Sequence, residues 1–147
     1  MGSVAFSEDE ILAAISCEAF GTAQSMREHE RKFGFVPVNP GEVPWLPADE
    51  WPNDVVISLD GHRVRIVFIY TLNPGNGAFS RLVTEIIRAE LIPTVIAPLG
   101  EMTDILTAWK WHHRIVGTTF DNRWDEWFPT KKWRMARLQE HPAGEST

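Results

Sequence analysis

The segment from Leu72 to Phe79 carries the strongest chemical signal in the sequence. Gly75 and Gly77 stand there between a run of strand-forming residues and an amphipathic pattern that predicts a helix. Glycine lets backbone N–H groups approach a ligand closely, and a helix N-terminus carries a partial positive charge. Such a junction suits a phosphate or pyrophosphate, although tight strand-to-helix turns also use glycine and asparagine for purely conformational reasons.

Two common phosphate-binding motifs are excluded at this segment. A Walker A loop needs Gly-Lys followed by Ser or Thr, and no lysine follows these glycines. A dinucleotide-binding fingerprint needs a third glycine three positions after the second, where this chain has Ser80. The segment is therefore either an anion-holding turn of another type or a structural turn.

The histidines and the single cysteine predict no metal site. Adjacent residues of a strand point to opposite faces of a sheet, so His112 and His113 are not expected to bind one ion together. No further His or Cys stands at ligand spacing near them. His29 falls on the apolar face of an expected helix, which favours a structural histidine. Cys17 is expected to be a small buried apolar residue.

The C-terminal segment 123–137 interleaves aromatic and basic side chains. It holds Trp124, Trp127, Phe128 and Trp133 among five arginines and lysines. Such residues can stack on nucleic-acid bases and contact phosphates, but they can equally form a final strand and helix that pack onto the domain. We expect packing; a protein partner or homodimer surface is the second alternative, and nucleic-acid binding is the third.

A pair of helices is expected over residues 7–34. Ser7 with Glu10 three residues later forms a capping box at the start of the first helix. The second helix is expected from Thr22 to Phe33, with Gly34 as its stop. Its inward face is expected to hold Met26, Phe33 and His29.

Residues 37–53 form a connection rich in proline and tryptophan. Five of the ten prolines fall there, and proline fixes φ and removes a backbone donor, so the segment is expected to be extended and non-helical. Trp45 and Trp51 are expected to hold it against the body of the domain, as a packed surface loop; a loop that faces a substrate is the alternative.

Residues 54–120 alternate strand and helix patterns. Val64, Ile66 and Phe68 alternate with Arg63, Arg65 and Val67 along one strand, so one face of it is expected to be buried. The expected elements are a strand at Asp54–Leu59, a hairpin turn at Asp60-Gly61, a strand at His62–Thr71, a helix from Phe79 to Leu91 with Arg81 and Thr84 on its wet face, a strand at Thr94–Ala97, a helix at Met102–Trp109 and a strand at Arg114–Phe120.

The length and composition favour one soluble domain. The chain has 147 residues, a net charge of −6 and ordinary hydrophobic content, which argues against general disorder and against a wholly basic nucleic-acid binder. No apolar run approaches the ~18 residues of a membrane span, and no secretory signal is visible. We therefore predict a cytoplasmic α/β (α+β) protein with a mixed central sheet flanked by helices, occupying residues 1–138, with a flexible tail at 139–147.

The order of elements and the loop Leu72-Asn73-Pro74-Gly75-Asn76-Gly77 resemble the GNAT superfamily of acetyl-coenzyme A-dependent N-acetyltransferases. In that family a central strand splays from its neighbour and leads into a loop of pattern Arg/Gln-x-x-Gly-x-Gly/Ala at the start of a helix. Both glycines match here, whereas Leu72 replaces the expected Arg or Gln. The resemblance covers residues 54–120 well, and small, divergent phage- or prophage-type members with a tryptophan-rich ending are the most similar.

The resemblance implies acetyl-coenzyme A as a substrate and no metal. The strand end Phe68, Ile69 and Tyr70 would run beside the pantetheine arm. The loop residues Asn73, Gly75, Asn76, Gly77 and Ala78 would contact the cofactor, and backbone amides from Gly75 onward would face the pyrophosphate.

The catalytic groups of the family are not found by the same comparison. Its frequent acid is a tyrosine on the second helix after the loop, where this chain has Leu106, and the strand His62–Tyr70 offers no carboxylate as a base. No catalytic residue is therefore predicted. The leading hypothesis is acetyl transfer to an amine of unknown identity. The alternative is a catalytically inactive module of this fold that acts through protein contacts or, less favoured, through nucleic acid.

Overall fold

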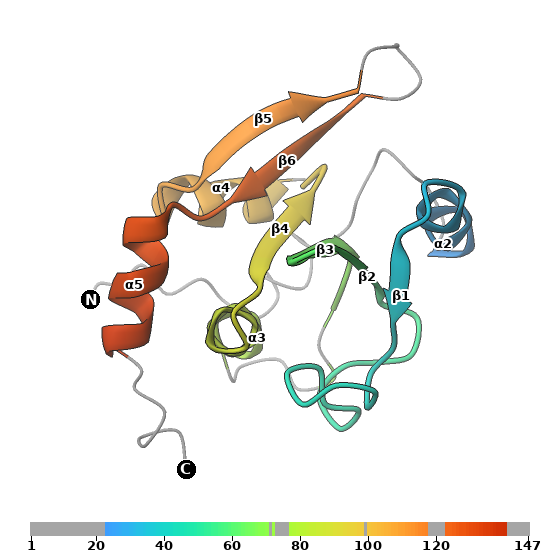
Figure 1. The fold of residues 1–147 in the computed structure, drawn as a ribbon, viewed down its shortest axis with the longest axis horizontal. Coiled ribbons are helices and arrows are strands. Elements are labelled where there is room, and N and C mark those ends of the chain that lie inside the picture. Colours follow the sequence, from blue (N-terminus) through green and yellow to red (C-terminus); the bar gives the residue numbers. More distant parts are fainter. Residues whose placement is uncertain (1–22, 71, 73–76, 99, 118–122, 141–147) are drawn as a thin grey trace.

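A computed structural model describes residues 23–70, 72, 77–98, 100–117 and 123–140 of the chain. Their fold is α+β, with helices packed around a twisted sheet (Figure 1). The first expected helix and residues 141–147 of the expected tail lie outside the described residues, whereas Gln139 and Glu140 belong to the last helix and not to a flexible tail. The elements, in chain order, are α2 (Ala23–Lys32), β1 (Val36–Val38), β2 (Val56–Asp60), β3 (Arg63–Phe68), α3 (Ala78–Arg88), β4 (Ile92–Ile96), α4 (Gly100–Ala108), β5 (His112–Val116), β6 (Trp124–Phe128) and α5 (Lys131–Glu140).

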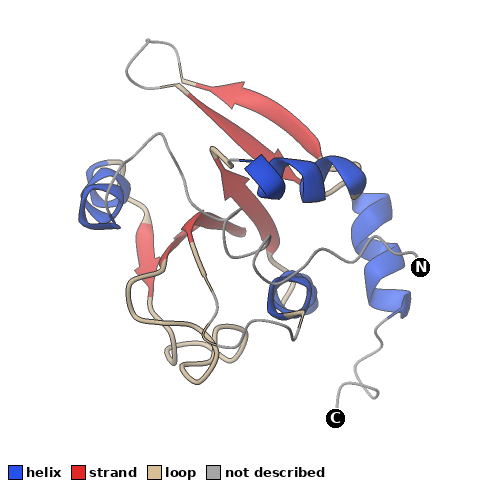
Figure 2. Ribbon diagram, turned by 180° about the vertical axis from the view of Figure 1, so that it is seen from behind, coloured by secondary structure: helices blue, strands red, loops and turns tan. Residues whose placement is uncertain are grey.

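The strands of the described part form one mixed sheet in the order β1-β2-β3-β4-β6-β5. Only β3 and β4 pair in parallel, and α3 makes the crossover between them that a parallel pair requires. The remaining pairs are antiparallel. β5 and β6 form an arm that is paired over five positions but is joined to β4 at only two, Val95↔Trp127 and Ile96↔Glu126. Figure 2 shows α4 in front of this part of the sheet when the molecule is viewed from behind.

Each face of the sheet carries its own apolar core. The larger core joins β3, α3 and α4 to the proline- and tryptophan-rich segment, with Val64, Phe79, Leu106 and Trp51 among its members. The smaller core lies under α2, where Met26 packs with residues of β2, β3, β4 and β6: Val56, Val67, Ile96 and Trp124. β3 is therefore covered on both faces, as is usual for a strand in parallel pairing.

Where bounds for an element were predicted from the sequence, most of them agree with the structure within two residues. The expected hairpin turn at Asp60-Gly61 joins β2 to β3, with Gly61 in the left-handed region at a φ of 64°. Trp45 and Trp51 are buried, as expected. The strand expected at Arg114–Phe120 is β5, which begins at His112, and residues 118–120 lie outside the described part. Sequence reasoning missed β1, because Pro37 at its centre argued against a strand; proline is tolerated there since β1 is at the edge of the sheet.

Phe68 does not continue the face of Val64 and Ile66. A β-bulge between Val56 and Ile57 of β2 makes Phe68 pair with Val56 while Ile66 pairs with Ile57, so Val67 is an extra residue. An extra residue shifts the alternation of side chains by one position. Phe68 consequently packs against the core under α2, on the face opposite to the one expected.

Two expected solvent faces were wrong as well. Arg65 was placed opposite the buried face of its strand, yet it is 2% exposed. Thr84 was assigned to the wet face of α3, yet it is buried and its hydroxyl donates a hydrogen bond to the carbonyl of Ser80. A hydroxyl can be buried on a helix because it can bond a carbonyl of the preceding turn.

Phe33 was expected to point inward from α2 but is 44% exposed. α2 ends in a Schellman arrangement, in which Phe35 N donates to Glu30 O and Gly34 N donates to Arg31 O, with Gly34 at φ 80°. This ending turns the chain away at Phe33. The ring instead stacks on Phe35 at 6.0 Å between centroids and meets Trp124 edge-on at 5.7 Å.

Of the described helices, none is both long enough and apolar enough to pass through a membrane.

Candidate functional site

The first candidate site is the junction between the end of β3 and the start of α3. β3 pairs with β4 from Arg63↔Ile92 to Ile66↔Val95 and no further. Beyond that point β4 turns to β6, where Ala97 N donates to the carbonyl of Asp125 over 2.7 Å. Parallel pairing of the two strands thus ends just before the segment that leads to α3, and we refer to this region, from Phe68 to Ala78, as the junction.

Gly77 is the residue that caps α3 at its N-terminus. Its φ of 66° and ψ of 32° lie in the left-handed region, which side chains with a Cβ adopt only at a cost. There is room for a side chain at this position, since a Cβ here would meet only the Arg81 guanidinium at 4.0 Å. The first turn of α3 has no acidic side chain, and Ala78 is buried beneath it. Such a helix start is electrostatically suited to an anion.

The remaining loop residues predicted to bind the cofactor, Asn73, Gly75 and Asn76, lie outside the described residues. Glu50 of the proline- and tryptophan-rich segment contacts the residues on both sides of the loop, Leu72 and Arg81. The Glu50 carbonyl accepts a hydrogen bond of 2.8 Å from Leu72 N, and its carboxylate forms an ion pair with Arg81 on α3. This segment therefore fixes both ends of the loop, and a hollow of about 300 Å³ lies between it and α3.

The strand-end residues predicted to border a cofactor point in different directions. Ile69 is buried in the larger core, whereas Phe68 lies on the α2 side. Tyr70 is half-buried and its hydroxyl donates a hydrogen bond to Asp54 Oδ2 over 3.0 Å. That hydrogen bond, more than desolvation, raises the pKa of Tyr70 above 10.0, so the phenol stays protonated at neutral pH. Leu106, at the position of the family's acid, is fully buried.

A second candidate site was not anticipated from the sequence: a buried set of charged side chains formed by Glu30, Arg65 and Glu126, which we call the charge cluster. Arg65 donates from Nε and Nη2 to the two carboxylate oxygens of Glu30, over 2.9 and 3.1 Å. Its Nη1 donates to Glu126 Oε2 over 3.2 Å. Bidentate pairing of this kind is the strongest form of charged hydrogen bond. All three side chains are at most 6% exposed.

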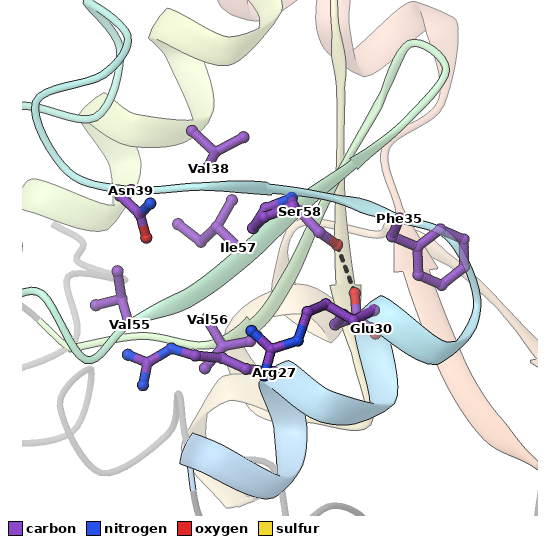
Figure 3. Close-up of a pocket in the computed structure, with 11 residues that line it drawn as sticks. Arg27, Glu30, Phe35, Val38, Asn39, Val55, Val56, Ile57 and Ser58 are labelled. Carbon is purple, nitrogen blue, oxygen red and sulfur yellow. Dashed lines mark hydrogen bonds between the residues drawn. The ribbon is translucent and has the colours of Figure 1, made fainter.

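Aromatic rings and a hydroxyl enclose the charge cluster. The Arg65 guanidinium lies 4.0 Å from the centroid of the Phe35 ring and 5.5 Å from that of Trp124. Ser58 donates a hydrogen bond to Glu30 Oε1, and Figure 3 shows this contact at the side of a small hollow between α2 and the β1–β2 strands. The polar atoms that were removed from water are therefore paired, which a buried charge requires.

His29 lies beside the charge cluster on α2, as a structural histidine. Its ring is 4.8 Å from the Phe33 ring and 5.4 Å from the Trp124 ring. Desolvation lowers the pKa of His29 below 6.5, because burial disfavours the charged imidazolium; the neighbouring Glu30 opposes that effect.

The tryptophan-rich basic end packs onto the body of the domain. Trp133 on α5 lies 5.3 Å from Trp109 and 5.4 Å from Trp111, ring to ring. Arg137 covers Trp133 at 4.5 Å and donates to the Ser80 hydroxyl, and desolvation lowers its pKa. Trp127 is buried and stacks on His113 at 4.6 Å. The aromatic side chains of this segment are thus engaged with the protein itself.

No cluster of three or more His, Cys, Asp or Glu suited to a metal occurs within the described residues. His112 and His113 contact different rings, Phe128 and Trp127, consistent with their opposite directions.

Comparison with known proteins gives no match: no family model, no curated protein and no solved structure is found to be similar. The function must therefore be inferred from these two sites.

Proposed function

We propose that the chain is an acetyl-coenzyme A-dependent N-acetyltransferase that acts on an amine of unknown identity. The observation that carries the proposal is the junction. Parallel pairing between β3 and β4 stops at Ile66↔Val95, β3 runs on towards the glycine-rich loop, and α3 begins at a left-handed Gly77. The end of parallel pairing before a glycine-containing segment and a helix is consistent with the splayed strand and loop expected from the resemblance to the GNAT superfamily.

In this proposal the junction binds the cofactor mainly through its backbone. The chain from Phe68 to Tyr70, beyond the last pair with β4, runs beside the pantetheine arm. The backbone amides from Gly75 to Ala78 face the pyrophosphate, where the dipole of α3 favours negative charge. The missing Arg or Gln at Leu72 removes one contact. The Arg81 guanidinium, one turn along α3 from Gly77, supplies a positive charge beside the junction, 4.0 Å from where a Cβ on Gly77 would lie.

The reaction is a direct transfer. The lone pair of the amine attacks the thioester carbonyl, a C–N bond forms, and the C–S bond breaks to release coenzyme A as a thiolate. The amine loses a proton to water or to a base, and the thiolate takes one up. We assign neither proton transfer to a side chain, because Tyr70 directs its proton to Asp54 and Leu106 has none to give. Rate enhancement would come from positioning the two reactants.

A catalytically inactive module of the same fold is the second candidate. Leu72 and the buried Leu106 favour it, since each stands where the family has a polar residue that serves the cofactor or the reaction. The module would bind coenzyme A or a protein partner without turnover.

Calorimetric titration with acetyl-coenzyme A and with coenzyme A tests the junction. Gly77→Glu places a carboxylate against the pyrophosphate and should abolish binding. Gly61→Glu is the matched control, because Gly61 has a φ of 64° and open space around it, so it suffers the same backbone strain at the β2–β3 turn. We expect both variants to lose similar stability, roughly 1–2 kcal/mol, and only Gly77→Glu to lose affinity.

Three outcomes decide between the candidates. Binding to the wild type, lost in Gly77→Glu and kept in Gly61→Glu, with thiol release in the presence of small amines, supports the transferase. The same binding without thiol release for any amine supports the inactive module. Absence of binding to both ligands, or equal binding by the two variants, contradicts a cofactor site at the junction.

A further inference from the structure

A cavity of about 400 Å³ lies on the α2 side of the sheet, between the end of α2 and the β5–β6 arm. Three aromatic side chains contribute to its wall, Phe33, Phe35 and Trp124. Three arginines on β3 and β5 contribute the other side: Arg63, Arg65 and Arg114. A volume of this size is within the range of small-molecule sites, roughly 300–1,000 Å³.

The arginines of this cavity converge on one carboxylate. Glu126 Oε1 accepts a hydrogen bond from Arg114 Nη2 over 3.2 Å and lies 3.8 Å from Arg63 Nη1. Glu126 Oε2 is bound by Arg65, whose other side is paired with Glu30. Three guanidinium groups therefore share the Glu126 carboxylate, and only Arg65 has a second carboxylate partner, Glu30. Asp60 also lines the cavity, but it is exposed and forms no ion pair within the part of the chain that the structure describes.

The Arg63 guanidinium has a hydrogen-bond donor beside Glu126 that no described residue accepts from. Its Nη1 atom is buried and has no hydrogen-bond partner among the described residues, because 3.8 Å to Glu126 is too long for a hydrogen bond. A buried donor without an acceptor is unfavourable, more so on a charged group. The Arg63 side chain is 30% exposed, so it can turn this donor towards an acceptor that enters the cavity between Arg63 and Arg114.

We infer that this cavity binds a small monocarboxylate whose body is aromatic or apolar. Arg63 and Arg114 share a single carboxylate, Glu126, and have donors left for one more, and a guanidinium binds a carboxylate in two-point fashion. A phosphate dianion would place a second negative charge beside Glu126, which disfavours it. The rings of Phe33, Phe35 and Trp124 provide the apolar surface for the rest of the ligand. The inference does not depend on the acetyltransferase proposal, since no residue of the junction lines the cavity.

Phenylacetate is a suitable probe, with phenylacetamide as its neutral isostere and phenyl phosphate as a dianion of similar shape. Binding is measured by calorimetry and by ligand-observed NMR on the full chain. We expect saturable binding of phenylacetate, and binding weaker by about tenfold or more for the amide and for the phosphate. Phenylacetate should also raise the melting temperature of the protein, because it binds only the folded state.

Two substitutions test the arginines. Arg63→Gln and Arg114→Gln should each weaken phenylacetate binding by about tenfold, because each removes a charged donor from a carboxylate. Both side chains are partly exposed, so the variants should remain folded. Arg88→Gln on α3 is the control, since Arg88 pairs with Glu85 and does not line the cavity, and it should bind as the wild type does.

The inference is overturned by an absence of saturable phenylacetate binding, or by binding that the two cavity substitutions leave unchanged. Equal or tighter binding of phenyl phosphate also overturns it, because the site would then not select a single negative charge. Failure here leaves the coenzyme A titration unaffected, so the two proposals can be judged separately.

Discussion

The charge cluster around Arg65 lies on β3 and the junction connects the end of β3 to Gly77 at the start of α3, yet the two are built in opposite ways. The junction is local in sequence, and its described geometry comes from backbone conformation at one glycine and one helix start. The charge cluster joins side chains 35 and 61 residues apart, from α2, β3 and β6. A site of the first kind can be changed with little effect on the fold, whereas one of the second kind is part of the core.

Substitutions that break the charge cluster should lower the stability of the protein more than substitutions at the junction. Arg65→Met leaves Glu30 and Glu126 buried without their shared cation, and we expect a loss of about 3–5 kcal/mol in the free energy of unfolding. Chemical denaturation measures it. Arg114→Gln is the control, because Arg114 contacts the same Glu126 from a side chain that is 51% exposed, and it should cost less than about 1 kcal/mol.

A second substitution shows whether uncompensated charge is the cause of that loss. In the Arg65→Met background, Glu30→Gln removes one buried negative charge and should restore part of the stability, although it costs stability in the wild type. If Glu30→Gln lowers stability equally in both backgrounds, the loss arises from packing around the guanidinium stem rather than from charge.

Glycine substitutions at the junction should have an intermediate effect. Gly77→Ala and Gly61→Ala both force a Cβ into the left-handed region, and each should lower stability by about 1–2 kcal/mol. Equal losses in thermal or chemical unfolding would show that the demand at Gly77 is conformational, as at an ordinary hairpin turn. A neutral Gly77→Ala would mean that α3 does not begin in the left-handed conformation, which would weaken the contrast between the two regions.

The smallest effect concerns the Tyr70–Asp54 hydrogen bond at the junction. Tyr70 is the only tyrosine, so the ultraviolet absorbance of the ionised phenol reports on it alone. Its titration midpoint should lie above 10.0 and should fall towards that value in Asp54→Asn. Because the folded-state pKa is raised, the protonated phenol favours the folded state below pH 10.0, and this contribution disappears as the pH rises through the folded-state pKa. An unchanged midpoint in Asp54→Asn would assign the shift to burial.

The parts of the fold that follow from periodicity were predictable. The helical spacing from Phe79 onward and the turn at Gly61 were both recognised because each depends on neighbours in sequence. The reversal at Phe68 was not, because it depends on a bulge that only the pairing with β2 creates.

Arg65 illustrates the limit for the sites. In an alternating strand pattern an arginine between valine and isoleucine indicates a solvated face, and nothing near it in sequence identifies Glu30 or Glu126 as partners. The sequence contained two separate signals, the run Arg63-Val64-Arg65 and the aromatic pair Phe33 and Phe35, and no local pattern connects them. The junction was predictable as a helix start, whereas coenzyme A could be proposed as its ligand only through the family resemblance.

The two edges of the sheet have a consequence for how the protein behaves at high concentration. An edge strand with unpaired backbone groups invites another chain to add to it. β1 is three residues long and has Pro37 at its centre, which offers no N–H, while β5 carries His112, His113 and Arg114 along the opposite edge. Among the described residues, β1 is therefore a poor template for a further strand, and the charge of Arg114 disfavours the addition of one at β5.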